Sequence, residues 1–253
     1  MFSTKLIYFN HLTTIMSGKF IMIDGLDGSG KGTVIDALSD YLEIKGKKVF
    51  DLRKHCKEHM DFPEFSELLE YDIIINAEPT YSHLGIAIRD EIVKDNQRKY
   101  SGLSTAHAFA LDREILYRKV IIPALEAGKT IIQERGVVSS FVYQPIQLER
   151  MNLQDIMNIP GNRLALKYAP SLLVLTQVDP QVVIHRLKER TKKDHAIFEK
   201  LVFQRQVANR YESDWLKKLF ESKGSKVVFL DTNYPKTVED TKKAAIEMWE
   251  KYN

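Results

Sequence analysis

The chain has 253 residues, of which 44% are hydrophobic, and its 37 basic and 34 acidic side chains leave a formal net charge of +3. This balance argues against a dedicated nucleic-acid-binding protein, which needs a strongly basic surface. A single cysteine, Cys56, excludes an internal disulfide framework and favours a reducing, cytoplasmic location. No apolar run approaches the roughly 20 residues that span a bilayer, so we expect no membrane segment.

The first 16 residues, MFSTKLIYFNHLTTIM, are expected to form an N-terminal extension that is disordered or precedes the native start. Asn10 and His11 interrupt its apolar groups, which is unlike a signal peptide, and Met16 is a second candidate start. We expect the remaining residues, 17–253, to form one α/β domain.

Short runs rich in Ile, Val and Leu predict strands over 20–24, 48–52, 72–76, 130–134, 172–176 and 227–231. These runs lack clean alternation, which is typical of strands covered on both faces. Helical patterns fill the gaps over 31–45, 84–95, 103–127, 152–168, 180–192, 195–222 and 236–252. Strands that alternate with helices predict a parallel sheet with right-handed crossovers and ligands at the carboxyl ends of the strands.

The first predicted strand runs directly into a glycine-rich segment, GLDGSGKGT, in which Gly25, Gly30 and Lys31 have the G-x-x-x-x-G-K spacing. Glycines let successive backbone N–H groups point at one anion, and the next helix directs its positive end there. Lys31 adds a mobile positive charge. The segment therefore predicts binding of a nucleoside triphosphate. The expected binding residues are Gly25, Asp27, Gly28, Ser29, Gly30, Lys31, Gly32 and Thr33.

Three further motifs follow along the chain. FALDR places Phe109 and Arg113 four residues apart, hence on one face of a helix, where a ring and a guanidinium make a reasonable reader of a pyrimidine base. The strand TIIQE ends at Glu134 and Arg135, where a planar guanidinium is suited to holding a phosphate. A basic segment over 186–199 follows the fifth predicted strand.

These motifs occur, in this order from about Phe20 to Tyr211, as they do in thymidylate kinases of the P-loop nucleoside-monophosphate kinase group, and the chain resembles that family. The resemblance implies a three-layer P-loop NTP hydrolase fold, with a parallel sheet of about five strands, helices on both faces and a short lid over about 186–199. It also implies ATP-dependent phosphorylation of dTMP to dTDP by in-line transfer, with Mg²⁺ as cofactor. The implied protein is a cytoplasmic homodimer without nucleic-acid or membrane partners.

The resemblance also implies residue roles. Phe109 would stack on thymine, Arg113 would donate to a base oxygen, and Tyr143 would pack against C2′ of the sugar. The implied catalytic residues are Lys31, Arg135, Arg186 and Arg190. The implied substrate-binding residues are Asp27, Glu78, Pro79, Arg89, Phe109, Arg113, Arg135, Ser139, Ser140, Tyr143 and Gln144. Asp27 and Glu134 would hold the metal through water.

The chain departs from the family pattern at several positions. Gly32 follows Lys31 where a metal-binding hydroxyl is usual, Ala77 stands where an arginine is common, and Gly136 replaces an aromatic residue. We expect Arg89 to supply the phosphate contact that Ala77 lacks. Residues 55–72 form an insertion that we expect to border the acceptor pocket.

Two alternatives remain at this point. One is a P-loop kinase for another nucleotide or for a nucleoside, which the insertion and Ala77 keep open. The other is a non-catalytic ATP-binding module, which would need the phosphate loop alone and leaves the FALDR motif and the basic segment unexplained.

Overall fold

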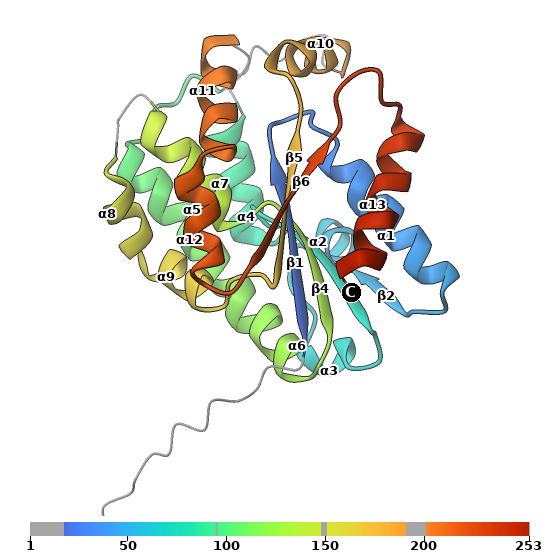
Figure 1. Cartoon of the computed structure of the whole chain (residues 1–253). Coiled ribbons are helices and arrows are strands. Elements are labelled where there is room, and N and C mark those ends of the chain that lie inside the picture. Colours follow the sequence, from blue (N-terminus) through green and yellow to red (C-terminus); the bar gives the residue numbers. More distant parts are fainter. Residues whose placement is uncertain (1–17, 95, 148–150, 191–200, 253) are drawn as a thin grey trace, which may run out of the picture.

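A computed structural model of the chain describes residues 18–94, 96–147, 151–190 and 201–252, apart from the side chains of 187–190. A central sheet lies between two helical layers (Figure 1). The expected extension over 1–16 and most of the expected lid, 191–199, lie outside the described residues. Within the described part of the chain, no helix is long and apolar enough to cross a membrane.

In these ranges the sheet has six parallel strands in the order β2-β3-β4-β1-β5-β6. Their bounds are β1 (Lys19–Gly25), β2 (Val49–Asp51), β3 (Ile73–Ala77), β4 (Thr130–Glu134), β5 (Leu172–Gln177) and β6 (Lys226–Asp231). Every predicted strand is present. The sheet has one strand more than the resemblance implied, because the short strand β2 pairs with β3 at its outer edge.

The central strand β1 is buried on both faces. Phe20 and Met22 belong to a cluster on one side of the sheet, and Ile21 and Ile23 belong to a cluster on the other side. Since successive side chains of a strand point to opposite faces, a strand with apolar residues at each position needs a helical layer on both sides. Ile23 is in register with Glu134 of β4 and Val174 of β5, so three strands end at one edge of the sheet.

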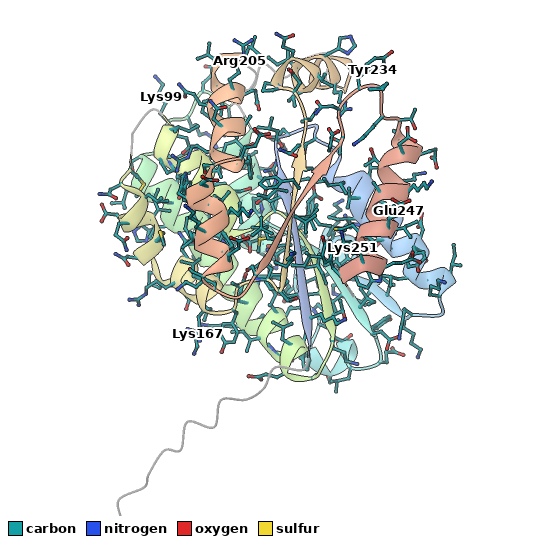
Figure 2. All side chains as sticks on the ribbon, viewed as in Figure 1. Lys99, Lys167, Arg205, Tyr234, Glu247 and Lys251 are labelled. Atoms are coloured by element: carbon teal, nitrogen blue, oxygen red, sulfur yellow. The ribbon has the colours of Figure 1, made fainter. Side chains whose placement is uncertain are left out.

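The helices form two unequal layers. The bounds of the α-helices are α1 (Lys31–Ile44), α2 (Leu52–His59), α3 (Phe65–Leu68), α4 (His83–Ile88), α5 (Gly102–Leu116), α6 (Ile122–Glu126), α7 (Val137–Tyr143), α8 (Leu153–Asn158), α9 (Pro160–Lys167), α10 (Pro180–Arg190), α11 (Leu201–Tyr211), α12 (Asp214–Glu221) and α13 (Val238–Tyr252). Helices α1 and α13 cover one face, and α5, α7, α9, α11 and α12 lie on the other (Figure 1). Glu247 and Lys251 of α13 and Tyr234, before that helix, lie on the outside of the molecule (Figure 2).

Four of the predicted helices are interrupted, three of them within residues 84–168. The pattern over 84–95 is α4 followed by the π-helical turn η1 (Arg89–Val93), and that over 103–127 is α5, the π-helical turn η2 (Tyr117–Ile121) and α6. The wider turn η2 accommodates the ring of Pro123, which clashes with the preceding turn of a regular α-helix. The pattern over 152–168 is divided at Ile159 (φ −58°, ψ 133°), since Pro160 holds the residue before it in an extended conformation.

The remaining differences concern helix ends and short helices. The pattern over 195–222 is α11 and α12, with 195–200 outside the described residues. Helices α2 and α7 were not expected. The sequence of α7, VVSSFVY, is rich in β-branched and aromatic residues that favour strands, and tertiary packing decides its conformation. A short 3₁₀ turn, η3 (Gln144–Ile146), continues α7.

The insertion over 55–72 is part of the core rather than an appended loop. Cys56, Phe62 and Leu68 are buried in the larger of the two apolar clusters. The segment is also joined to the start of α4, because the carbonyl of Met60 accepts a hydrogen bond from the N–H of His83 at 2.8 Å. The insertion therefore supports the loop that follows β3.

Helices α5 and α9 approach closely at Gly161. A Cβ atom at this glycine would lie 1.9 Å from the carbonyl oxygen of Ala110 and 2.8 Å from its carbonyl carbon. Ala110 belongs to the same helix as Phe109 and Arg113, so this contact sets the distance at which α5 presents both side chains.

We expect Gly161→Ala to destabilise the protein by about 1–3 kcal/mol, because α5 and α9 would have to separate. Urea unfolding of the nucleotide-free protein measures this effect. The control is Gly32→Ala, where an added Cβ meets nothing within 4 Å. At that helical position alanine should stabilise by roughly 0.5–1 kcal/mol. Equal stability of Gly161→Ala and the wild type would contradict the packing argument.

Candidate functional site

The glycine-rich segment connects β1 to α1 as a tight phosphate-binding loop. Gly25 has φ +149°, and a Cβ there would lie 2.3 Å from Oγ1 of Thr176, so only glycine fits. Gly30 precedes α1 with φ 86° and contributes no side-chain cap. The first-turn N–H groups of α1, at Lys31, Gly32 and Thr33, therefore present the positive end of the helix to an anion.

Residues at the ends of β5 and β6 hold the loop through hydrogen bonds. Oγ of Ser29 lies 2.6 Å from Oγ1 of Thr176 at the end of β5, and the Ser29 carbonyl accepts a hydrogen bond from Oγ1 of Thr232 at 3.0 Å. These contacts are buried, so they fix the loop backbone before a ligand arrives.

Lys31 lies inside the loop. Its ammonium donates to the carbonyl of Leu26 at 2.6 Å and to that of Gly25 at 3.2 Å. Burial, reinforced by the charge of Arg135, lowers the pKa of Lys31 to about 8, against the opposing effects of Asp27 and Asp24. A bound polyanion would restore the charged form of this side chain.

Arg186, the first of the two expected lid arginines, reaches the phosphate loop from α10. Its guanidinium donates to the carbonyl of Gly28 at 3.1 Å and to that of Thr232 at 2.9 Å. Arg190 lies at the end of α10, and its side chain, like the rest of the expected lid, is outside the described residues.

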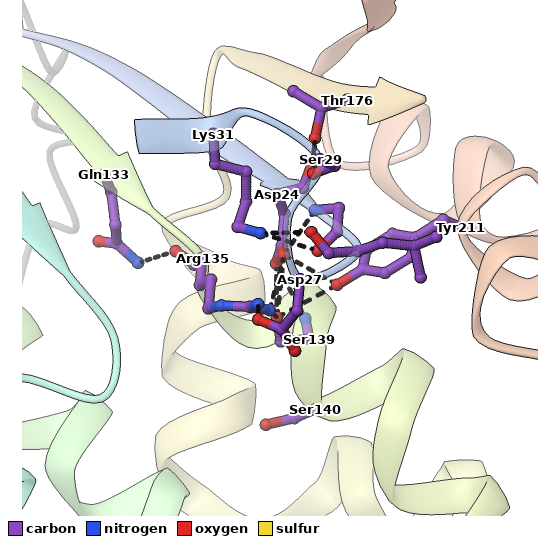
Figure 3. Close-up of polar contacts among 12 residues, drawn as sticks. Asp24, Asp27, Ser29, Lys31, Gln133, Arg135, Ser139, Ser140, Thr176 and Tyr211 are labelled. Carbon is purple, nitrogen blue, oxygen red and sulfur yellow. Dashed lines mark hydrogen bonds and ion pairs between the residues drawn. The ribbon is translucent and has the colours of Figure 1, made fainter. Parts of the chain in front are cut away.

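Arg135 lies between the phosphate loop and the neighbouring cavity (Figure 3). Its backbone has φ 62°, a left-handed conformation that non-glycine residues rarely adopt and that is common at functional sites. The side chain forms an ion pair with Asp27 and donates to Oγ of Ser139 at 3.2 Å. Burial alone would raise the pKa of Asp27, but Arg135 and Lys31 lower it overall, so Asp27 is a carboxylate at neutral pH.

A cavity of about 240 Å³ opens beside Arg135. Each of the expected substrate-binding residues lines it: Asp27, Glu78, Pro79, Arg89, Phe109, Arg113, Arg135, Ser139, Ser140, Tyr143 and Gln144. The cavity is also lined by Tyr81, Val93 and Gln147, which carry no motif and were not expected from the sequence. Phe109 is half-buried on this wall rather than turned into the core, which places an aromatic surface in the cavity.

Arg113 is held from three elements at the bottom of the cavity. Its Nε donates to Glu78 at 2.7 Å and one Nη to Ser140 of α7 at 3.1 Å. Its other Nη donates to Asn162 of α9. Because each nitrogen of the guanidinium has a protein partner, Arg113 is held in one orientation, as a binding site requires. Asn162 carries no motif signal and could not be found from the sequence.

Glu78 is buried against this guanidinium. Burial raises the pKa of Glu78 to about 7, and the nearby Asp112 adds to the rise, while Arg113 opposes it. Asp112 also has a raised pKa because of burial, although it accepts hydrogen bonds from the N–H of Thr80 at 2.7 Å and from its hydroxyl at 2.6 Å.

Arg89 belongs to the turn η1 and also lines the cavity. Its Nε donates to the carbonyl of Thr80 at 3.1 Å, and its guanidinium carbon lies 3.9 Å from the ring centre of Tyr81. Arg89 and Ala77, where a cation was expected to be missing, both line the cavity.

The expectation that the insertion over 55–72 borders the cavity is wrong, since none of its residues lines it. The segment and the residues just before it instead contact side chains that line the cavity, Tyr81 and Glu134. Lys57 lies 4.4 Å from the ring centre of Tyr81, and Arg53, just before the insertion, lies 3.9 Å from the carboxylate of Glu134. The insertion packs on the core because its apolar residues are buried there.

Gly136 is explained by its surroundings. A Cβ at this position would lie 2.5 Å from Cε of Met22 and 2.9 Å from Nε2 of Gln133. A larger residue would have to displace the side chains of Met22 and Gln133, which occupy the space beside Gly136 in this chain.

The described residues contain no cluster of three or more His, Cys, Asp or Glu side chains able to hold a metal ion. Asp27 and Glu134 are separate carboxylates near the phosphate loop, and both line the cavity. This donor set fits Mg²⁺, which proteins commonly hold through one or two carboxylates together with substrate phosphates and water.

Stability should fall as pH rises through the titration of Glu78. The unfolded carboxyl loses its proton near its ordinary pKa of 4.5, while the folded one keeps it up to about 7. Hence the unfolding free energy of the wild type should decrease relative to Glu78→Gln between these values and level off above. Denaturant unfolding at a series of pH values measures the difference. If the unfolding free energy of the wild type relative to Glu78→Gln were constant or grew with pH, the raised pKa of Glu78 would be contradicted.

Comparison with known proteins agrees with this site. A family model described as thymidylate kinase matches residues 64–244. The thymidylate kinase of Caldicellulosiruptor saccharolyticus is 30% identical over 197 residues, covering 78% of this chain and 82% of its own. The probable thymidylate kinase of Pyrococcus abyssi is 31% identical over 200 residues, which cover 78% of this chain and 82% of that protein.

Solved structures are similar in fold. The thymidylate kinase of Ehrlichia chaffeensis has a TM-score of 0.58 at 18% identity, covering 92% of this chain and 98% of its own. That of Candida albicans has a TM-score of 0.61 at 20% identity, with 92% of each chain covered. The family match spans most of the chain, and the relatives match over most of their length. The chain therefore belongs to the thymidylate kinase family.

Proposed function

We propose that this protein phosphorylates dTMP to dTDP with ATP as the donor. The observation that carries the proposal is the position of Arg135, which pairs with Asp27 of the phosphate loop and lines the cavity that also holds Phe109 and Arg113. A donor site for a triphosphate and a pocket for an aromatic base thus share one cation.

In the reaction, an oxygen of the dTMP 5′-phosphate attacks the γ-phosphorus of ATP, and the bond from that phosphorus to the bridging β-oxygen breaks. ADP leaves, and the γ-phosphoryl group becomes the β-phosphate of dTDP. The attacking oxygen is already anionic, so no general base is needed. Catalysis consists of aligning two polyanions and neutralising the charge on the group in transfer.

Four cations of this chain are proposed to supply that neutralisation. Lys31 exchanges the loop carbonyls for the outer phosphates of ATP, and Arg135 holds the acceptor phosphate. Arg186 donates to the loop carbonyl of Gly28, and its proposed role is to support the donor phosphates. Arg190 is proposed as a second lid cation on the basis of the family resemblance.

The acceptor base is proposed to lie against Phe109. Arg113, fixed by Glu78 and Ser140, directs donors toward a base oxygen, and Gln144 lines the same wall. Tyr143 packs against Phe203 and Tyr211 with ring-centre distances of 6.2 Å to each, which holds its ring in place. Its proposed role, taken from the family resemblance, is to exclude a ribose 2′-hydroxyl.

Mg²⁺ is proposed as the cofactor, held by Asp27 and Glu134 through water. Bound there, it would neutralise part of the negative charge of the ATP phosphates. We also propose, from the family resemblance, a cytoplasmic homodimer. The exposed Leu103 and Leu111 on the outer face of α5 are apolar side chains that a second copy would cover.

A panel assay tests the function. ADP release from ATP and Mg²⁺ is measured with each nucleoside, deoxynucleoside and monophosphate as acceptor, because the related structure from Candida albicans is described as having broad substrate specificity. We expect the highest kcat/KM with dTMP. A higher value with another acceptor would show a kinase of different specificity, and no acceptor-dependent release would favour an ATP-binding module.

The proposed stacking of the base on Phe109 has its own test. Phe109→Ala should raise the KM for dTMP about tenfold or more through loss of base stacking, with the KM for ATP unchanged within about twofold. His107→Ala is the matched control, since this residue lies on the same helix but is exposed and outside the cavity. Equal KM values for dTMP in both variants would remove Phe109 from the base site.

A further inference from the structure

Asp24, the residue before Gly25, is a buried carboxylate that no motif assigned to the site. It lies at the carboxyl end of β1 and has 0% exposure. A carboxylate without solvent must be matched by donors, because an unpaired buried charge is costly. Its partners therefore show what it is for.

The donors come from three separate parts of the chain. The N–H of Gly25 donates to Asp24 at 2.8 Å, and α7 provides the N–H of Ser139 at 3.1 Å and its hydroxyl at 2.9 Å. Helix α11 provides the hydroxyl of Tyr211 at 2.8 Å. Arg135 approaches the same carboxylate at 3.7 Å. Figure 3 shows these groups converging on Asp24.

The direction of the hydrogen bonds links Asp24 to Arg135. Arg135 donates to Oγ of Ser139 at 3.2 Å, and the Ser139 hydroxyl donates onward to Asp24. The serine thus accepts from the guanidinium with its lone pair because its own proton is committed to the carboxylate. Burial, with the charge of Asp24, also raises the pKa of Tyr211, which keeps its hydroxyl a donor.

We propose that Asp24 is a positioning residue that orients Arg135 toward the acceptor phosphate, through Ser139 and with Tyr211 as a second anchor. This inference rests on the proposed function and adds a set of residues to it. Asp27 holds the outer end of the guanidinium, and the Asp24 group holds its inner side. Arg135 is thereby fixed in the plane between the two substrates, although its backbone is left-handed.

Tyr211→Phe and Ser139→Ala each remove one hydroxyl and leave the carboxylate in place. We expect each to lower kcat/KM for dTMP about tenfold, the effect of losing a hydrogen bond to a charged group. The affinity for dTMP without ATP, measured by calorimetry, should fall similarly. The KM for ATP should stay within about twofold, since the loop is held separately by Thr176 and Thr232.

The matched control is Ser171→Ala. The Ser171 hydroxyl also bonds β1, at its opposite end, where it accepts from the N–H of Phe20 at 3.2 Å and donates to its carbonyl at 3.0 Å. This variant should lose comparable thermal stability and retain dTMP affinity. Asp24→Asn should lower kcat/KM and the affinity for dTMP further than the hydroxyl variants do. If Asp24→Asn does not fold, Tyr211→Phe and Ser139→Ala still test the inference.

The possible results separate the inference from the function. An inactive wild type would overturn the proposed function. An active wild type with Tyr211→Phe and Ser139→Ala indistinguishable from Ser171→Ala in dTMP affinity would overturn the role of Asp24 alone. A parallel loss of ATP and dTMP affinity would also contradict it, because that result indicates a general disturbance of β1.

Discussion

The contact between Arg135 and the two aspartates of the β1 end is the interaction on which the site depends. Asp27 belongs to the phosphate loop and Asp24 to the strand before it, whereas Arg135 ends the neighbouring strand β4. The parallel register of β1 and β4 makes this contact unavoidable, since both strands end at one edge. One guanidinium thus contacts the phosphate-binding loop and lines the cavity beside it. In the proposed function, the charge of the two substrates would replace part of the charge of the aspartates.

Much of this arrangement could be predicted from the sequence, because it depends on local patterns. The apolar runs identify strands by composition, and the glycine spacing before Lys31 requires a backbone that curls around an anion. The motif at Phe109 and Arg113 places two side chains on one helix face whatever the tertiary structure. These signals locate the residues that line the cavity, while their roles toward substrate remain proposals.

The rest depends on contacts between distant segments, which leave no local pattern. Asn162 reaches Arg113 from α9, and Tyr211 reaches Asp24 from α11, across separations that no motif spans. The insertion was expected at the pocket because of its place in the chain, but its buried apolar residues draw it to the core. Helix α7 has a sequence that favours a strand, and it is helical because it packs between β1 and the helices around it.

The central claim is that the phosphate loop and the cavity hold the two ends of one phosphate chain. The most direct measurement is a crystal structure with a bisubstrate analogue in which thymidine and adenosine are joined through their 5′-phosphates. The account predicts phosphates running from the first turn of α1 past Lys31 to Arg135, with thymine against Phe109. Thymine bound outside the cavity, or a phosphate chain that does not reach Arg135, would contradict it.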